Sequence, residues 1–136
     1  MGFEFDELSS RVIAAAIEVH KRLGPGFLES VYEQALRLEL SDRGIPFEPQ
    51  KEIEVLYGGR QVGTHILDLL VANTLVVELK AVKSLEDIHY AQVKSYLRAS
   101  GTNLGLLMNF NSTTLDVKRV VLRFENRSAP PADARV

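Results

Sequence analysis

Two acidic residues and a lysine interrupt the most apolar part of this chain. Asp68 lies in one apolar run, and Glu78 and Lys80 lie in the next. Residues 72–74, Ala-Asn-Thr, separate the runs and predict a tight turn between two β-strands. Because side chains two residues apart share a face of a strand, Glu78 and Lys80 should project together. A carboxylate and an amine are therefore expected to point into one small space.

Whether Asp68 joins this pair depends on the length of the turn. If residues 72–74 all belong to the loop, Val71 pairs with Leu75, and Asp68 lies opposite Glu78 at cross-strand distance. A two-residue loop would place the two acids on opposite faces of the sheet. We expect the longer loop, which brings the two carboxylates together.

Two carboxylates this close require a proton or a cation between them, because like charges at short range raise the pKa of one of them. A hard divalent cation suits such a pair. Mg²⁺ typically binds one or two protein carboxylates together with water and phosphate oxygens. Asp68 and Glu78 are therefore candidate ligands for Mg²⁺ or Mn²⁺.

Helical periodicity precedes these strands. Apolar residues recur at helical spacing from Leu8 to Leu23, with Asp6 as the expected N-cap. A second helix follows and ends at Gly44. Its expected apolar stripe consists of Leu28, Val31, Tyr32, Ala35 and Leu36. Glu29 lies in its first turn, where the helix dipole favours any acid, so an ordinary helix-start role and a role at the site both stay open.

The segment before Asp68 alternates with period two, which predicts a β-hairpin. Gly58-Gly59 supplies a two-residue turn that pairs Tyr57 with Arg60 and places Val55 beside Val62. Together with the strand that begins at Leu75, this hairpin completes a three-strand antiparallel meander.

A third helix and two strands follow the meander. Ser84, with Asp87 three residues later, predicts a capping box that opens the helix, and Gly101 closes it. The stripe expected on this helix contains Ile88, Gln92, Ser95, Tyr96 and Ala99. Residues 103–110 read as a strand buried on both faces and central in the sheet, and residues 115–124 as a last strand. This order predicts an α+β layered domain with helices on a mixed sheet.

The composition is that of an ordinary globular protein with one core. The length of 136 residues predicts a single domain over residues 1–125, followed by a mobile tail at 126–136 that contains Pro130-Pro131. The absence of cysteine excludes a disulfide scaffold and thiolate metal sites. No signal peptide or long apolar span is evident, so we expect a cytoplasmic protein that does not enter membranes.

The charge of the chain is unevenly distributed. The net charge of −2 argues weakly against a protein that coats nucleic acid. Residues 1–79 carry a balance of −6, however, and residues 80–127 carry +4. This asymmetry suits an acidic metal site beside a basic surface that binds anions, although an uneven scatter of surface charges explains the count equally well.

Three motifs together resemble the PD-(D/E)XK nuclease superfamily. Asp68 followed by Glu78-Leu79-Lys80 matches its D…ExK signature, although Leu67 stands in place of proline. Residues 26–32, Gly-Phe-Leu-Glu-Ser-Val-Tyr, are similar to the GxxExxY family within that superfamily. Residues 92–96, Gln-Val-Lys-Ser-Tyr, match the QxxxY helix motif of one branch of these nucleases. The resemblance covers roughly residues 8–124 and implies a core of helix, three-strand meander, helix and strand.

The resemblance also implies roles for particular residues. Asp68 and Glu78 would be the metal carboxylates, with the Leu79 backbone carbonyl as a further ligand. Glu29 would be a supporting acid close to the metal, and Lys80 would orient or deprotonate the attacking water. Gln92 and Tyr96 would steady the site or the substrate. The basic candidates for phosphate contacts are Lys83, Lys94 and Arg98.

This sequence differs at two places near the motifs from the pattern that we expect for the family. His65 and Ile66 stand where relatives often carry an arginine, and Lys83 stands where some carry an acid. Neither departure removes an expected metal ligand.

Two hypotheses about function follow. The first is a Mg²⁺- or Mn²⁺-dependent nuclease, with DNA favoured over RNA by analogy. The second is a catalytically silent nuclease fold that binds a protein partner or self-associates, for example as a homodimer. The intact Asp68, Glu78 and Lys80 favour the first hypothesis. The acidic total, the small size and the lack of an evident target-recognition domain favour the second.

Overall fold

The computed structural model describes residues 2–122, and side chains are described from residue 7 onward. The predicted tail at 126–136 and the end of the predicted last strand, residues 123–124, lie outside the described residues. No helix within the described range has both the length and the apolar character needed to cross a membrane.

Two helices precede the sheet, as the periodicity predicted. They are α1 (Gly2–Leu23) and α2 (Glu29–Asp42). The expectation that Asp6 caps α1 was wrong, because the helix begins at Gly2 and includes Asp6. Aspartate favours a helix N-terminus, but inside a helix it is less favourable than alanine by only about 0.7 kcal/mol. The helix can therefore begin before Asp6.

Five strands form one mixed sheet with the order β1-β2-β3-β4-β5. The strands are β1 (Phe47–Tyr57), β2 (Arg60–Val71), β3 (Leu75–Lys80), β4 (Leu104–Asn109) and β5 (Asp116–Val121). The β1-β2-β3 meander is antiparallel, as predicted. The third helix, α3 (Asp87–Ser100), connects β3 to β4, which run parallel. The fully buried β4 is an interior strand, but β3 rather than β4 occupies the centre.

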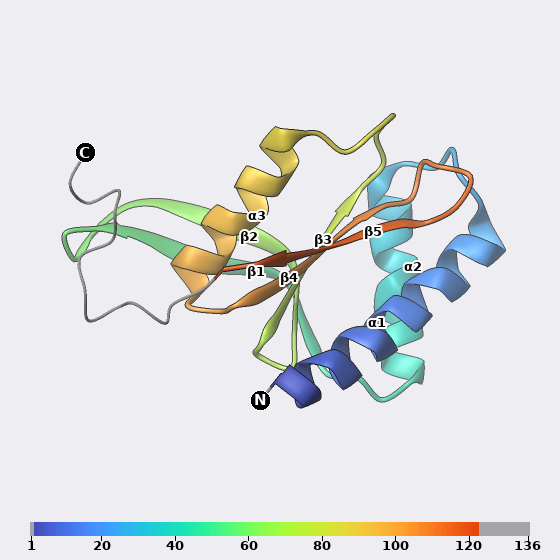
Figure 1. Ribbon diagram of the computed structural model, residues 1–136, viewed down its shortest axis with the longest axis horizontal. Helices are drawn as coiled ribbons and strands as arrows, with labels where there is room; N and C mark the ends of the chain where they lie inside the picture. The colour runs from blue at the N-terminus through green and yellow to red at the C-terminus, as the bar shows by residue number, and fades with distance from the viewer. Residues whose placement is uncertain (1, 123–136) are drawn as a thin grey trace.

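The helices cover opposite faces of the sheet, which confirms the α+β layered fold (Figure 1). Side chains of α1 and α2, such as Val12 and Leu36, pack with Leu79 in one apolar cluster. Side chains of α3, such as Val93 and Leu97, pack with Val76 in a second cluster. Alternate residues of β3 therefore enter different layers, and Glu78 and Lys80 lie on the α3 side because Leu79 lies on the other.

Parts of two expected helix stripes are exposed. On α2, Tyr32 and Leu36 are fully buried, but Leu28 is 76% exposed and Val31 is 37% exposed. On α3, the buried residues include Tyr96, whereas Ile88 is 68% exposed. These expectations failed because each helix contacts the sheet along a narrower strip than its apolar pattern suggested.

The start of α3 also differs from the expected capping box. The helix begins at Asp87 with Glu86 as its N-cap, so Ser84 is not the cap. The Glu86 backbone N–H donates to Nδ1 of His89 at 2.9 Å, which supplies the return bond that a glutamate or glutamine usually provides. The predicted end was right, because Gly101 adopts φ 74° as the C-cap.

The predicted register is correct for the β2–β3 hairpin and only partly correct for the β1–β2 hairpin. In the β2–β3 pair, Val71 lies opposite Leu75, which confirms the three-residue loop. In the β1–β2 pair, Tyr57 lies opposite Arg60 as predicted. An irregularity next to Val55 then shifts the register, so Val55 pairs with Gly63 instead of Val62. A β-bulge of this kind adds one residue to one strand, and the alternating pattern alone does not reveal it.

Candidate active site

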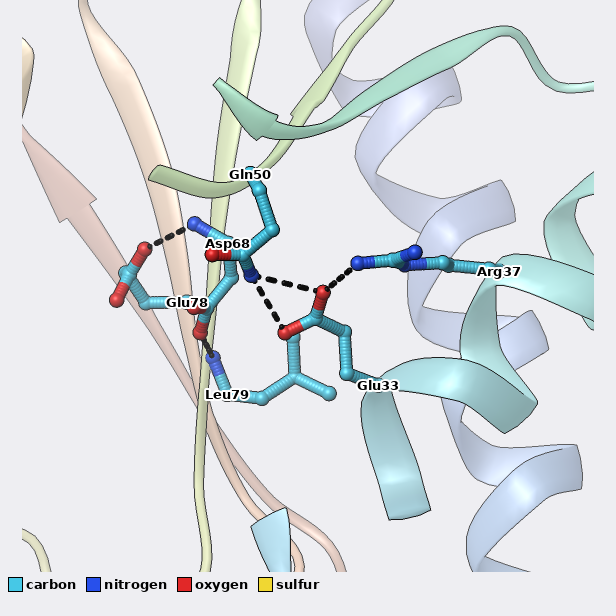
Figure 2. Close-up of polar contacts among 6 residues, drawn as sticks. All are labelled: Glu33, Arg37, Gln50, Asp68, Glu78 and Leu79. Carbon is cyan, nitrogen blue, oxygen red and sulfur yellow. Dashed lines mark hydrogen bonds and ion pairs between the residues drawn. The ribbon is translucent and has the colours of Figure 1, made fainter. Parts of the chain in front are cut away.

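Asp68 and Glu78 face each other at the point where pairing between β2 and β3 ends. The last paired positions are Leu69 and Val77, and the carboxylates take over the next hydrogen bonds. The Asp68 backbone N–H donates to Glu78 Oε1 at 2.8 Å, and the Leu79 backbone N–H donates to Asp68 Oδ2 at 2.9 Å (Figure 2). Each acid is therefore held by the backbone of the opposite strand.

The electrostatics of this pair favour a bound proton or cation. Burial, followed by the charge of Asp68, raises the pKa of Glu78 to about 8. Burial also raises the pKa of Asp68, and the hydrogen bond from Leu79 opposes that rise. Glu78 is only 3% exposed, so little water screens the repulsion between the carboxylates. Without a cation, the pair retains a proton at neutral pH.

Lys80 lies close to the two acids and contacts α3. Lys80 Nζ donates to Oε1 of Gln92 at 3.1 Å, which links the end of β3 to α3. The charge of Lys80 lowers the pKa of both Asp68 and Glu78, although burial outweighs it. The structure thus brings Asp68, Glu78, Lys80 and Gln92 together.

Tyr96, one helical turn after Gln92, lies beside the same acids. Its pKa is raised to about 12, first by burial and then by the charges of Glu78 and Asp68. The phenol therefore stays protonated and is available as a hydrogen-bond donor. His65 contacts the ring of Tyr96 edge-on, with ring centroids 4.6 Å apart.

Glu29 approaches from α2, on the other side of the sheet. Burial, followed by the charge of Asp68, raises the pKa of Glu29, whereas Lys80 lowers it. Glu29 is therefore within electrostatic reach of the pair. No hydrogen bond or ion pair of Glu29 is found among the described residues, so its role stays a prediction.

The other residues of the GxxExxY motif shape the loop that places Glu29. Gly26 adopts φ 109°, which an L side chain rarely accepts. The buried Tyr32 hydroxyl donates to the Gly24 carbonyl at 2.5 Å and accepts from the Phe27 backbone N–H at 3.2 Å. Tyr32 also stacks on Phe110 with centroids 4.7 Å apart. The glycine and the tyrosine of the motif are thus structural.

The chemistry of the acids suits a hard divalent cation. Within residues 2–122, no three acidic or histidine side chains gather closely enough to hold a metal ion by themselves. Two carboxylates are nevertheless a usual protein contribution to Mg²⁺, which keeps several water ligands. The two backbone hydrogen bonds use Glu78 Oε1 and Asp68 Oδ2, and a side-chain hydrogen bond between the two acids lowers the pKa of Asp68. The Leu79 carbonyl stays a candidate ligand on the resemblance alone.

The basic candidates lie around α3. Lys83 is exposed in the β3–α3 connection, and Lys94 and Arg98 are exposed on α3. None of the three forms a salt bridge within the described part of the chain. Arg98 also lines a groove of about 380 Å³ together with His65 and Ser95. Their roles in phosphate binding stay predictions.

Sequence reasoning missed a polar network behind Asp68. Glu33 is buried at 7% exposure, accepts two hydrogen bonds from Gln50 and forms an ion pair with Arg37 (Figure 2). Its charge also raises the pKa of Asp68. The spacing of Glu29, Glu33 and Arg37, four residues apart on one helix, is a signal that could have indicated this network.

Comparison with known proteins supports the resemblance. The family model for the PD-(D/E)XK nuclease superfamily matches residues 6–120. No curated protein matches the sequence. The crystal structure of SSO0001 is similar with a TM-score of 0.57 and 19% identity, covering 73% of this chain and 52% of that one. This chain therefore spans about half the length of that protein, and the likeness concerns the fold.

Proposed function

Because the chain belongs to the PD-(D/E)XK nuclease superfamily, we propose that it is a Mg²⁺-dependent nuclease that hydrolyses phosphodiester bonds in nucleic acid. The observation that carries this proposal is the facing pair of Asp68 and Glu78, with Lys80 held beside it by Gln92. Within the superfamily, residues 26–32 favour the GxxExxY family.

Hydrolysis of a phosphodiester requires stabilisation of the negative charge that builds on the phosphoryl and leaving oxygens. Asp68 and Glu78 are the residues that would hold the cation, which supplies Lewis acidity and lowers the pKa of bound water. Lys80 adds a positive charge on the same face and positions the attacking water, and its action as a general base is the second option. Gln92 keeps the Lys80 amine directed at this space.

The exposed Lys83, Lys94 and Arg98 supply positive charge near α3 for the phosphate backbone of the substrate. DNA is favoured over RNA by analogy with the superfamily alone. A cytoplasmic location, where nucleic acid is accessible, belongs to the same proposal.

The proposal is tested by cleavage of supercoiled, linear and single-stranded DNA and of RNA in Mg²⁺, Mn²⁺ or EDTA. We expect cleavage by wild type in either metal, none in EDTA, and a loss of at least about a hundredfold in Lys80→Ala. The matched control is Lys21→Ala, because Lys21 is exposed at the end of α1. Equal cleavage by wild type and Lys80→Ala would overturn the proposal.

The exposed apolar residues of the β1–β2 hairpin favour the second candidate function, a silent nuclease fold that self-associates or binds a protein. Leu56 is 57% exposed, Tyr57 is 79% exposed and Val62 is 65% exposed. The hairpin extends away from the body of the domain (Figure 1). A homodimer through this hairpin would appear in light scattering as twice the chain mass, and Tyr57→Ser would return it to a monomer. A monomer at all concentrations would contradict self-association.

A further inference from the structure

The pairing between β1 and β2 skips one position next to the active site. Pro49 pairs with Leu69 and Lys51 pairs with Leu67, but the intervening Gln50 and Asp68 are unpaired. Gln50 adopts φ 49°, a left-handed conformation that is uncommon for a residue other than glycine. The β1–β2 ladder thus lacks one pair at the position of Asp68, although both strands continue through it; we call this missing pair the break.

The side-chain alternation of β2 changes at the same position as this break. Leu67 and Leu70 both pack in the cluster under α3, although strict alternation would send residues three apart to opposite faces. Leu69, between them, packs in the α1–α2 cluster. The alternation therefore changes phase between Leu67 and Leu69, at the position of Asp68. The Asp68 carboxylate accepts the hydrogen bond from the Leu79 backbone of β3.

The side chain of Gln50 is clamped in place. Its Nε2 donates to both carboxylate oxygens of Glu33, at 3.0 and 2.9 Å. Glu33 is in turn held by its ion pair with Arg37 on the same helix. Figure 2 shows Gln50 beside Asp68, with its amide directed to Glu33 on α2. This contact links α2 to β1 at the break, and Glu33 and Gln50 are 17 residues apart in sequence.

We propose that Glu33 holds the side chain of Gln50, that this contact keeps the Gln50 backbone in its left-handed conformation within β1, and that both are positioning residues that thereby present Asp68 to Leu79 and Glu78. Glu33 does not serve as a metal ligand in this arrangement, because both of its oxygens are bound to Gln50 and one also to Arg37. The part of the proposal that concerns metal binding rests on the proposed nuclease function. The part that concerns Asp68 geometry does not.

The geometric part is tested by amide hydrogen exchange of Leu79 in Gln50→Gly. Glycine accepts the left-handed conformation without strain. This variant therefore removes the hydrogen bonds to Glu33 but still allows the backbone conformation at position 50. Gln50→Asn is a second variant, because asparagine also tolerates this conformation and is too short to replace the glutamine reach. The variant that is the better folded of the two is measured. In it, we expect the protection of the Leu79 amide against exchange to fall at least about tenfold relative to that of the Val77 amide of the same strand.

The matched control is Gln61→Gly, because Gln61 lies on the same hairpin and, within residues 7–122, its side chain bonds to Gly63 and Thr64 of its own strand. We expect it to leave the relative protection of Leu79 unchanged. Retained protection of Leu79 in a folded Gln50→Gly or Gln50→Asn variant would overturn the proposal, as would an equal loss in Gln61→Gly.

The metal part is tested by titration of Mn²⁺ alone into each variant by calorimetry. We expect Gln50→Gly to bind Mn²⁺ at least about tenfold more weakly than wild type, because outer residues that orient ligands typically contribute 10- to 100-fold in affinity. Equal affinity would overturn the metal part. If wild type binds no Mn²⁺, the proposed nuclease function fails, and the exchange of Leu79 still decides the geometric part.

Discussion

Glu78 Oε1 accepts a hydrogen bond from the backbone N–H of Asp68 at 2.8 Å, so each of the two acids is anchored to the strand that carries the other. Together with the reverse bond from Leu79, this contact replaces the backbone pairing that would continue from Leu69 and Val77. The carboxylates are therefore arranged before any ligand binds. Such preorganisation is what a metal site or an active site requires.

The buried Glu78 should make the stability of the metal-free protein depend on pH. Its pKa is raised to about 8, so between its ordinary pKa and 8 the folded state holds a proton that the unfolded state has lost. The unfolding free energy therefore falls as pH rises through this window. By urea denaturation in EDTA, we expect wild type to lose on the order of a few kcal/mol between pH 5 and pH 9, and Glu78→Gln to lose less.

Added Mg²⁺ should restore the stability of wild type at pH 9, because a cation replaces the missing proton, and should have little effect on Glu78→Gln. If the unfolding free energies of wild type and Glu78→Gln depended equally on pH, the assignment of the raised pKa to Glu78 would be contradicted.

Removing the partner of Lys80 should slow cleavage without unfolding the protein. Gln92→Leu deletes the acceptor of the Lys80 Nζ hydrogen bond, so the amine is no longer directed to the acids. We expect cleavage to fall by roughly tenfold to a hundredfold. In the double variant with Lys80→Ala, Gln92→Leu should cause no further loss, because its effect acts through Lys80. Additive losses would show that Gln92 acts independently, and Gln61→Leu is the matched control.

The hydroxyl of Tyr32 should stabilise the loop before α2. Tyr32→Phe keeps the ring in the core but removes the hydrogen bonds to the Gly24 carbonyl and from the Phe27 backbone. We expect a loss of about 1 to 2 kcal/mol in unfolding free energy, measured by urea denaturation. Tyr57→Phe is the control, because Tyr57 is 79% exposed and should show no measurable loss. Equal stability of the two variants would contradict a structural role for the motif tyrosine.

Gly105 should be required for the close approach of α3 to β4. A Cβ atom at this position would lie 2.8 Å from Cγ1 of Val93 on α3. We expect Gly105→Ala to lose roughly 1 to 3 kcal/mol in unfolding free energy through overpacking. The matched control is Gly63→Ala on β2, where a Cβ atom would meet nothing within 4 Å. A Gly105→Ala variant as stable as the control would show that α3 moves away at no cost.

Binding of nucleic acid should weaken with salt in proportion to the number of phosphate contacts. If Lys94 and Arg98 contact phosphates of duplex DNA, each neutral substitution should reduce the slope of log affinity against log salt by about 0.9. Lys94→Gln and Arg98→Gln can be measured by fluorescence anisotropy with a short duplex. Lys21→Gln, on the opposite side of the sheet, should leave the slope unchanged. A slope that does not respond to either α3 variant would place the DNA elsewhere.

Most of the fold was predictable because it depends on local signals. Period-two alternation and turn length predicted the meander and the pairing of Val71 with Leu75, which placed Asp68 opposite Glu78. Helical spacing predicted the three helices, and Gly101 correctly marked the end of α3. The errors at Asp6 and Ser84 concern helix starts, where several residues compete for the same capping role.

The sequence by itself determined which residue types are candidate cation ligands, and with the expected three-residue loop it predicted that β2 and β3 would bring two of them together. Only the tertiary structure decided the left-handed break at Gln50, the clamp that Glu33 forms with it and the burial that raises the pKa of Glu78. The physical reason is range. Periodicity and turn length act between neighbours in sequence, whereas burial and the Glu33–Gln50 contact arise only when α2 and the sheet pack together.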